Sequence, residues 1–377
     1  MDTIKQNKAI KGSFWGALAF YFLIAFEFAY MAGPFAMYFY SVYAPVLNFF
    51  NNSPALSWLS SFFLPHAARE NASYIISFIQ IAGNVLAITG FLAFCTGACQ
   101  VYYYKITKKG IVTGGIYNRI RHPQYASFIV CSLGLLIIWP RYIAAILFVT
   151  MIFFYYLLAK VEEIECGRKF GRSYIDFKNK TGMFLPLKLS FLPKLPKQRS
   201  KRILCIIGIY LLSVAAVLCA AKGLNKLTID SLYAAYTDTS VNVALSRLSD
   251  EKINTVVSIA LNSEDVANRF KSFDDNAKFI NYILPTEWFA AEVPMNGLQR
   301  GQGHKSPRNY DRNLYKVILT KADIRDGKAA TGKDILTSVY MREPILEVWV
   351  DLSTNTVIKI LEMPTEIKYK GIPGAVY

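Results

Sequence analysis

The stretch PQYASFIVCSLGLLIIWPRYIAAILFVTMIFFYYLLAKVEE (residues 123–163) decides the fold of this 377-residue chain. It holds two apolar runs, 125–140 and 142–158, which are joined by little more than Pro140 and Arg141. An apolar helix of about 20 residues crosses a hydrocarbon core of roughly 30 Å. The two runs therefore predict a pair of short antiparallel membrane helices. Because the turn is tight, the start of the first helix and the end of the second lie at the same membrane face.

Three further apolar runs, 14–40, 74–103 and 203–221, raise the expected number of transmembrane helices to about five. With the N-terminal lysines in the cytoplasm, 20 basic residues fall on the cytoplasmic side, against Arg69 and Arg141 outside. This is the bias that orients membrane proteins. It predicts a cytoplasmic N-terminus and an extracytoplasmic C-terminal domain in a plasma or inner membrane. The first run is too long for a cleaved signal, so we expect it to be retained.

The charge of the chain is unevenly distributed. The formal net charge of +16 arises entirely within residues 1–222, which hold 23 Lys and Arg against 7 Asp and Glu, whereas residues 223–377 hold 19 of each. A basic membrane half is explained by positive loops at the inner leaflet. We therefore expect no nucleic-acid partner.

The sequence after the fifth run changes to that of a soluble domain of ordinary size. Helical periodicity appears at 229–236 and 241–260, and Ser263 is a candidate N-cap of a further helix. Residues 317–319 are β-like, and 345–361 read as a hairpin. The fold class is thus an all-α polytopic membrane domain (1–200), a fifth transmembrane helix (201–222) and a soluble extracytoplasmic α+β domain (223–377).

Charged motifs precede and follow the helix pair in the sequence. GGIYNRIRHPQYASF (residues 114–128) leads into its first helix, and KVEEIECGRKFGRSY (residues 160–174) follows its second. Pro123 suits the first turn of a helix, where a missing N–H costs nothing. Arg121 and His122 come just before that positive helix end, and a guanidinium beside free N–H groups is a natural receptor for a carboxylate or phosphate.

The second helix returns to the same face and brings Glu162 and Glu163 towards Arg121. Two carboxylates opposite a basic helix start can hold a zwitterion, since the carboxylates take an ammonium group or ribose hydroxyls and the arginine takes a carboxylate. S-adenosylmethionine has this charge pattern. A plain Arg–Glu salt bridge that pins two helices explains the same charges equally well.

The ordered motifs resemble the isoprenylcysteine carboxyl methyltransferases and phospholipid methyltransferases, a group of membrane enzymes. The resemblance covers roughly residues 74–190 and rests on Gly115-x-Tyr117, Arg121-His122-Pro123-x-Tyr125, Glu162-Glu163, Phe170-Gly171-x-x-Tyr174 and Pro186. It implies an S-adenosylmethionine-dependent methyltransferase whose cofactor is bound by Tyr117, Arg121, His122, Pro123, Tyr125, Glu162 and Glu163.

The resemblance also implies that a lipidic or thiol/carboxyl acceptor enters the site from the bilayer, and that Arg121 and Glu162 act in catalysis by orienting the reactants. Two positions depart from the usual pattern. Ala126 follows Tyr125 where a small residue followed by Gly is common, and Cys166 replaces an aliphatic residue. The acceptor and the oligomeric state stay open.

Two alternatives remain. Sterol reductases share an Arg-His-Pro-x-Tyr segment and a late stretch similar to residues 166–171, which predicts an NADPH-dependent membrane reductase. The third reading is an inactive membrane scaffold that displays the external domain as a binding module. With three histidines in the chain and no Walker loop, neither a His-rich metal centre nor a soluble-type nucleotide fold is indicated.

Overall fold

The computed structural model of the protein describes most of the chain beyond residue 73. The described residues are 22, 25, 29, 33–35, 50, 53, 55–65, 70, 73–186, 196–289, 295–296, 306–324 and 329–363. The chain forms two compact units that interleave along the sequence. Unit 1 comprises Met1–Ser41, Ala87–Ser132 and Leu147–Tyr210, and unit 2 comprises Val42–Leu86, Leu133–Ile146 and Leu211–Tyr377.

Among the described residues, three helices are long and apolar enough to cross a membrane: α4 (Tyr74–Ile106), α6 (Tyr142–Phe170) and α8 (Arg199–Asp230). The apolar helix α5 (Pro123–Ile138) is shorter. These four helices correspond to the second to fifth predicted spans. The first predicted span, 14–40, falls largely outside the described residues, so the predicted total of about five stays a prediction.

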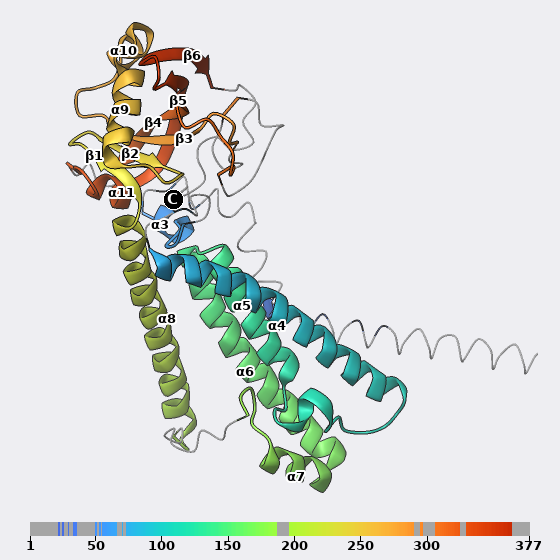
Figure 1. Ribbon diagram of the computed structural model, residues 1–377. Coiled ribbons are helices and arrows are strands. Elements are labelled where there is room, and N and C mark those ends of the chain that lie inside the picture. Colours follow the sequence, from blue (N-terminus) through green and yellow to red (C-terminus); the bar gives the residue numbers. More distant parts are fainter. Residues whose placement is uncertain are drawn as a thin grey trace, which may run out of the picture. The chain divides into compact units, whose positions relative to one another are not determined.

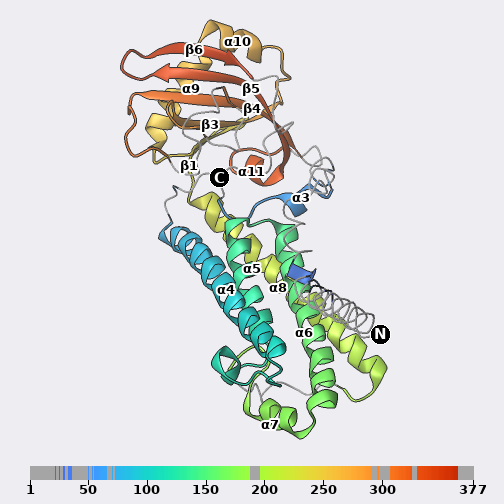
Figure 2. The same cartoon turned by 90° about the vertical axis from the view of Figure 1, so that its right-hand side faces the viewer.

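Within unit 1, α4, α5 and α6 run side by side, as both ribbon views show (Figures 1 and 2). Gly90 of α4 sits against α5, where a Cβ atom would lie 2.4 Å from the backbone nitrogen of Cys131. Aromatic rings fill the space further along, and Tyr125 of α5 stacks on Tyr155 of α6 with ring centroids 4.7 Å apart. A small residue at the crossing and large rings beside it fix how these helices pack.

The polar end of unit 1 holds two short helices, η1 (Gly115–Asn118) before α5 and α7 (Arg172–Lys180) after α6. Gly171 separates α6 from α7 at φ +55°, a left-handed conformation that glycine adopts at low cost. The chain therefore reverses sharply here and carries α7 back to the start of α5.

Unit 2 contains a six-stranded sheet in the order β1-β2-β3-β4-β5-β6. Neighbouring strands are antiparallel except β2 and β3, which are parallel and joined through two helices. The strands are β1 (Tyr233–Tyr236), β2 (Ser240–Ala244), β3 (Lys278–Pro285), β4 (Leu314–Ile324), β5 (Val339–Asp351) and β6 (Thr356–Glu362).

Helices cover both faces of this sheet. The connection from β2 to β3 supplies α9 (Asp250–Leu261) and α10 (Glu264–Phe270), and α9 buries one face through Ile253, Val256 and Ala260. The opposite core cluster takes residues from α11 (Asp334–Ser338), from the end of α8, and Phe62. Phe62 follows α3 (Ser57–Ser60), so an early segment completes the core of the C-terminal sheet.

The sheet confirms the predicted mixture of helices and strands but corrects two of its elements. Residues 233–236 form a strand, although the 229–236 segment was predicted to be helical, and 240–244 form another strand ahead of α9. The helix after Ser263, the strand at 317–319 and the hairpin at 345–361 are confirmed. In a short segment of Ala, Val and Tyr, the apolar spacing suits a strand as well as one turn of helix. Pairing with a neighbouring strand therefore decides which of the two forms.

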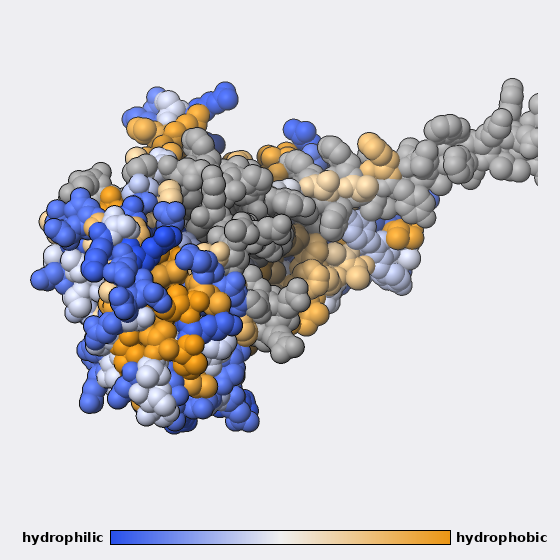
Figure 3. All heavy atoms as spheres, turned by 90° about the horizontal axis from the view of Figure 1, so that it is seen from above, coloured by the Kyte–Doolittle hydropathy of each residue, from blue (hydrophilic) through white to orange (hydrophobic). Residues whose placement is uncertain are grey.

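The surface of unit 2 changes character between the sheet and α8. Figure 3 shows mostly hydrophilic side chains around a smaller hydrophobic patch on the visible face of the sheet-containing part. Large apolar side chains are instead exposed on the part of α8 that belongs to unit 2, among them Leu211 and Leu212. This contrast fits a soluble domain attached to a helix that faces lipid.

Candidate active site

The candidate site is built where the start of α5 meets the polar end of α6. The predicted juxtaposition is present: Nε of Arg121 lies 2.8 Å from Oε1 of Glu163. Pro123 is the first residue of α5, as its missing N–H led us to expect.

The backbone around Arg121 is fixed by the segment after α7. The N–H groups of Arg121 and His122 donate to the carbonyl oxygens of Gly182 and Met183, at 2.9 and 3.1 Å. The N–H of Gly182 donates in return to the carbonyl oxygen of Arg119. This short parallel ladder holds the entrance to α5 in one conformation.

The guanidinium of Arg121 adds further hydrogen bonds between the start of α5 and the end of α7. Its Nη1 donates to the carbonyl oxygen of Lys178 at 3.0 Å and to that of Thr181. Both carbonyls belong to the C-terminal end of α7, where a cation is favoured by unpaired C=O groups and by the helix dipole. Arg121 therefore ties α5, α6 and α7 together.

Glu163 is the acidic centre of this junction. Its side chain is 1% exposed and lies among cations, with Lys178 Nζ at 2.8 Å and Lys160 Nζ at 3.9 Å in addition to Arg121. A buried carboxylate needs such partners to remain charged. Glu163 thus has its charge satisfied within the protein, and it does not line the adjacent cavity.

Glu162, the neighbouring residue, is placed differently. Its side chain is 37% exposed, its Oε2 lies 3.2 Å from Nδ1 of His122, and its Oε1 accepts a hydrogen bond from the hydroxyl of Tyr125. The ring of Tyr125 is buried and stacks between His122 and Tyr155. Glu162 is therefore a partly exposed carboxylate whose orientation is set by two buried side chains.

The two glutamates also set the charge of His122. Burial by itself lowers the pKa of this imidazole, but the hydrogen bonds and charges of Glu162 and Glu163 outweigh burial and raise the pKa above its ordinary value of 6.5. The protonated form is thereby favoured beside the carboxylates.

A cavity of about 1010 Å³ opens beside these groups, wholly within unit 1. Tyr117, Arg121, His122 and Glu162 line it, whereas Pro123, Tyr125 and Glu163 stand behind the lining. Further lining residues that are not among the predicted cofactor-binding residues include Tyr102, Tyr104, Gln124, Glu165, Cys166, Lys169, Tyr174 and Phe177.

Tyr117 gives this cavity an unsatisfied polar group. Its side chain is buried, and its hydroxyl has no hydrogen-bond partner among the described residues. Burial, and then the charge of Glu162, raises the pKa of the phenol, so it stays a neutral donor. A buried hydroxyl without a partner has a donor that is free to bond to a water molecule or to a ligand.

The residues that contribute to the site but were not predicted to do so come mainly from α7 and from the end of α4. Lys178 pairs with Glu163 but was not among the predicted site residues. Its signal was the spacing of Tyr174 and Lys178, which puts both on one face of a short helix. The tyrosines near the end of α4 are typical of residues at a membrane interface, so nothing in the sequence marked them as residues of a binding site.

No group of side chains that could hold a metal ion occurs in the described part of the chain. The described fold and site define a class: a membrane protein with a polar cavity where two helices of its bundle end. Residues 72–173 match the family model of the phospholipid methyltransferases, which confirms the resemblance over the segment that builds α4, α5 and α6. Tyr174 and Pro186 lie beyond the matched residues. No curated protein and no solved structure matches the chain.

Proposed function

We propose that this protein is an integral membrane methyltransferase that uses S-adenosylmethionine and acts on a lipidic acceptor. One observation carries the proposal: within the segment that matches the methyltransferase family, Glu162 is held by Tyr125 and His122 at the wall of a cavity of about 1010 Å³. That volume is at the upper end of the range for ligand pockets, about 300–1,000 Å³, and leaves room for a nucleoside cofactor with part of an acceptor.

The residues divide into those that contact the cofactor and those that position them. Glu162 takes the ammonium group or the ribose hydroxyls, and the unpartnered hydroxyl of Tyr117 donates to a polar atom of the ligand. Arg121 also lines the cavity, and its positive charge favours the carboxylate of the cofactor. Glu163, Pro123 and Tyr125 hold these groups in place.

S-adenosylmethionine supplies a methyl group on a positively charged sulfonium. The transfer needs no covalent attachment to the protein, so the contribution of this chain is to orient two reactants and to exclude water. Tyr174 and Phe177 line the cavity, and aromatic rings favour a cation beside them. The apolar helices around the cavity give a lipidic acceptor a route from the bilayer.

The same proposal covers orientation in the membrane. We place the cavity on the cytoplasmic side and the sheet-containing domain outside, with boundaries at 1–200, 201–222 and 223–377, because basic residues concentrate around the proposed site. This arrangement puts the cofactor pool and the cavity in the same compartment.

Titration calorimetry on the detergent-purified protein separates the proposal from its alternatives. We expect S-adenosylhomocysteine to bind and NADPH not to bind. Binding of NADPH alone would identify a reductase of the sterol reductase type, and binding of neither ligand would leave a scaffold. Incubation with methyl-labelled cofactor and a total lipid extract then identifies the acceptor from the labelled product.

A further inference from the structure

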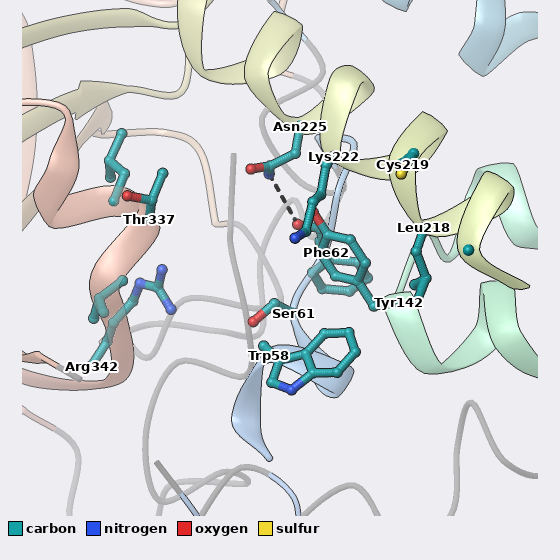
Figure 4. A pocket seen from close by; sticks show the side chains of 13 residues that line it. Trp58, Ser61, Phe62, Tyr142, Leu218, Cys219, Lys222, Asn225, Thr337 and Arg342 are labelled. Carbon is teal, nitrogen blue, oxygen red and sulfur yellow. Dashed lines mark hydrogen bonds between the residues drawn. The ribbon is translucent and has the colours of Figure 1, made fainter. Parts of the chain in front are cut away.

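A second cavity, of about 670 Å³, lies within unit 2 (Figure 4). Its walls come from the segment around α3, the C-terminal part of α8, and the region where α11 runs into β5. Nothing in the proposed methyl transfer uses this cavity, so its role is an independent question.

Arg342 of β5 is the unusual member of this lining. The residue is 5% exposed, and its Nε is buried without a hydrogen-bond partner among the described residues. No carboxylate of the described chain forms an ion pair with it. A buried guanidinium cannot lose its proton, so leaving it uncompensated is costly.

A second cation faces the same space. Figure 4 shows the ammonium of Lys222, from α8, and the guanidinium of Arg342 directed into the cavity from different sides. Among the described residues that line the cavity there is no Asp or Glu. The cavity therefore presents two positive groups, with Ser61 and Thr337 hydroxyls nearby, to whatever fills it.

The rest of the wall is apolar. Trp58, Phe62, Tyr142 and Leu218 line it, and Leu218 belongs to the long helix that has the composition of a membrane span. Two turns earlier on that helix, Leu211 and Leu212 are exposed. A free inorganic anion would neutralise the two cations but leave the apolar wall uncovered. An anionic amphiphile neutralises the cations with its headgroup and covers the wall with its apolar part.

We infer that this cavity binds the anionic headgroup of a phospholipid, with the phosphate between Arg342 and Lys222 and the acyl chains along α8. Arginine favours phosphate because its planar fork matches two phosphate oxygens, and lysine adds a point charge. The lipid would belong to the leaflet that borders the C-terminal part of α8. This inference does not depend on the proposed methyltransferase activity.

Native mass spectrometry of the full-length protein tests the inference with three probes: phosphatidylglycerol, phosphatidylcholine and glycerol 3-phosphate. We expect phosphatidylglycerol to bind at least about tenfold more tightly than either other probe. Loss of one charge-assisted hydrogen bond corresponds to about a tenfold change in affinity, so Arg342→Gln should weaken phosphatidylglycerol binding by about that factor.

Lys222→Gln should weaken the same binding by about threefold to tenfold, and it serves as the second variant because Lys222 is exposed and its replacement leaves the fold intact. Lys226→Gln is the matched control, since Lys226 is an exposed lysine one turn further along α8 that does not line the cavity. Equal binding of the two lipids, equal binding of glycerol 3-phosphate and lipid, or equal losses in Lys222→Gln and Lys226→Gln would each overturn the inference.

Discussion

The adjacent glutamates Glu162 and Glu163 of α6 have different environments, one at the cavity wall and one among positive charges. Glu163 is surrounded by Arg121, Lys160 and Lys178, whereas Glu162 is held by Tyr125 and His122 at the cavity wall. On a helix, neighbours in sequence point about 100° apart, so one side chain can face the protein while the next faces a ligand. The salt bridge and the ligand site suggested by the sequence are therefore compatible.

Replacement of each glutamate by glutamine should separate these roles. We expect Glu162→Gln to lower the affinity for S-adenosylhomocysteine by about tenfold, the effect of losing one charged hydrogen bond, with little change in melting temperature. Glu163→Gln should instead reduce stability by about 1–3 kcal/mol, because it leaves the buried guanidinium of Arg121 without its counter-charge. Calorimetry and thermal denaturation measure the two effects. The reverse pattern would show that the roles are exchanged.

His122 should make stability depend on pH. Its pKa is raised in the folded protein, so the contribution of the protonated imidazole is fully present below its ordinary value of 6.5 and is lost as the pH rises through the higher folded-state pKa. We expect the melting temperature of the wild type to fall over this range relative to that of His122→Gln. A difference between the two proteins that stays constant from pH 5.5 to 9 would contradict this assignment.

At the scale of elements, the sequence predicts the membrane helices better than it predicts the sheet. Pro123 marks the start of α5 because proline is tolerated in a first turn and excluded further in. The segment 229–236 has no such marker, and its apolar spacing suits either a helix or a strand. Pairing of β1 with β2 decides between them, and that pairing is invisible in a local pattern.

The crossing of α4 and α5 provides a test at this scale. A Cβ at Gly90 would lie 2.4 Å from the backbone nitrogen of Cys131 and 2.9 Å from the carbonyl oxygen of Ser127, and backbone atoms cannot move aside cheaply. We expect Gly90→Ala to destabilise the protein by about 1–3 kcal/mol, as overpacking does. Thermal denaturation in detergent measures this effect.

Gly208→Ala is the control for this substitution, because Gly208 also lies in a long apolar helix and a Cβ there meets no atom within 4 Å. The control should melt at the wild-type temperature or slightly above, since alanine favours the helix. Equal melting temperatures for both variants would mean that the helices do not approach closely at Gly90.

In the molecule as a whole, motif order predicted which residues lie close together at the candidate site, but it did not predict their burial or their partners. Arg121 and Glu163 were both expected to contact a cofactor. Their contacts with the α7 carbonyls and Lys178 depend on a chain reversal at Gly171, which the motifs do not specify. Packing of Phe62 in the core of the C-terminal sheet was likewise not predictable, because contacts between distant residues leave no local periodicity in the sequence.

The predicted topology is tested with single added cysteines at exposed positions. Thr113→Cys lies before η1 and Thr354→Cys lies in the turn between β5 and β6. We expect a membrane-impermeant maleimide to label Thr354→Cys in intact cells and Thr113→Cys after permeabilisation, with the wild-type chain as the background control. Labelling of both positions from one side would refute the proposed orientation.

The participation of an early segment in the C-terminal core has a consequence for biosynthesis. The backbone carbonyls of Phe62 and Phe63 are bonded by Asn225 and Thr228, which follow them by 163 and 165 residues. At a translation rate of about 5–20 residues per second, these aromatic residues leave the ribosome roughly 10–30 s before their partners. During that interval the two carbonyls lack their native hydrogen-bond donors, so we expect the membrane or a chaperone to protect this segment from aggregation.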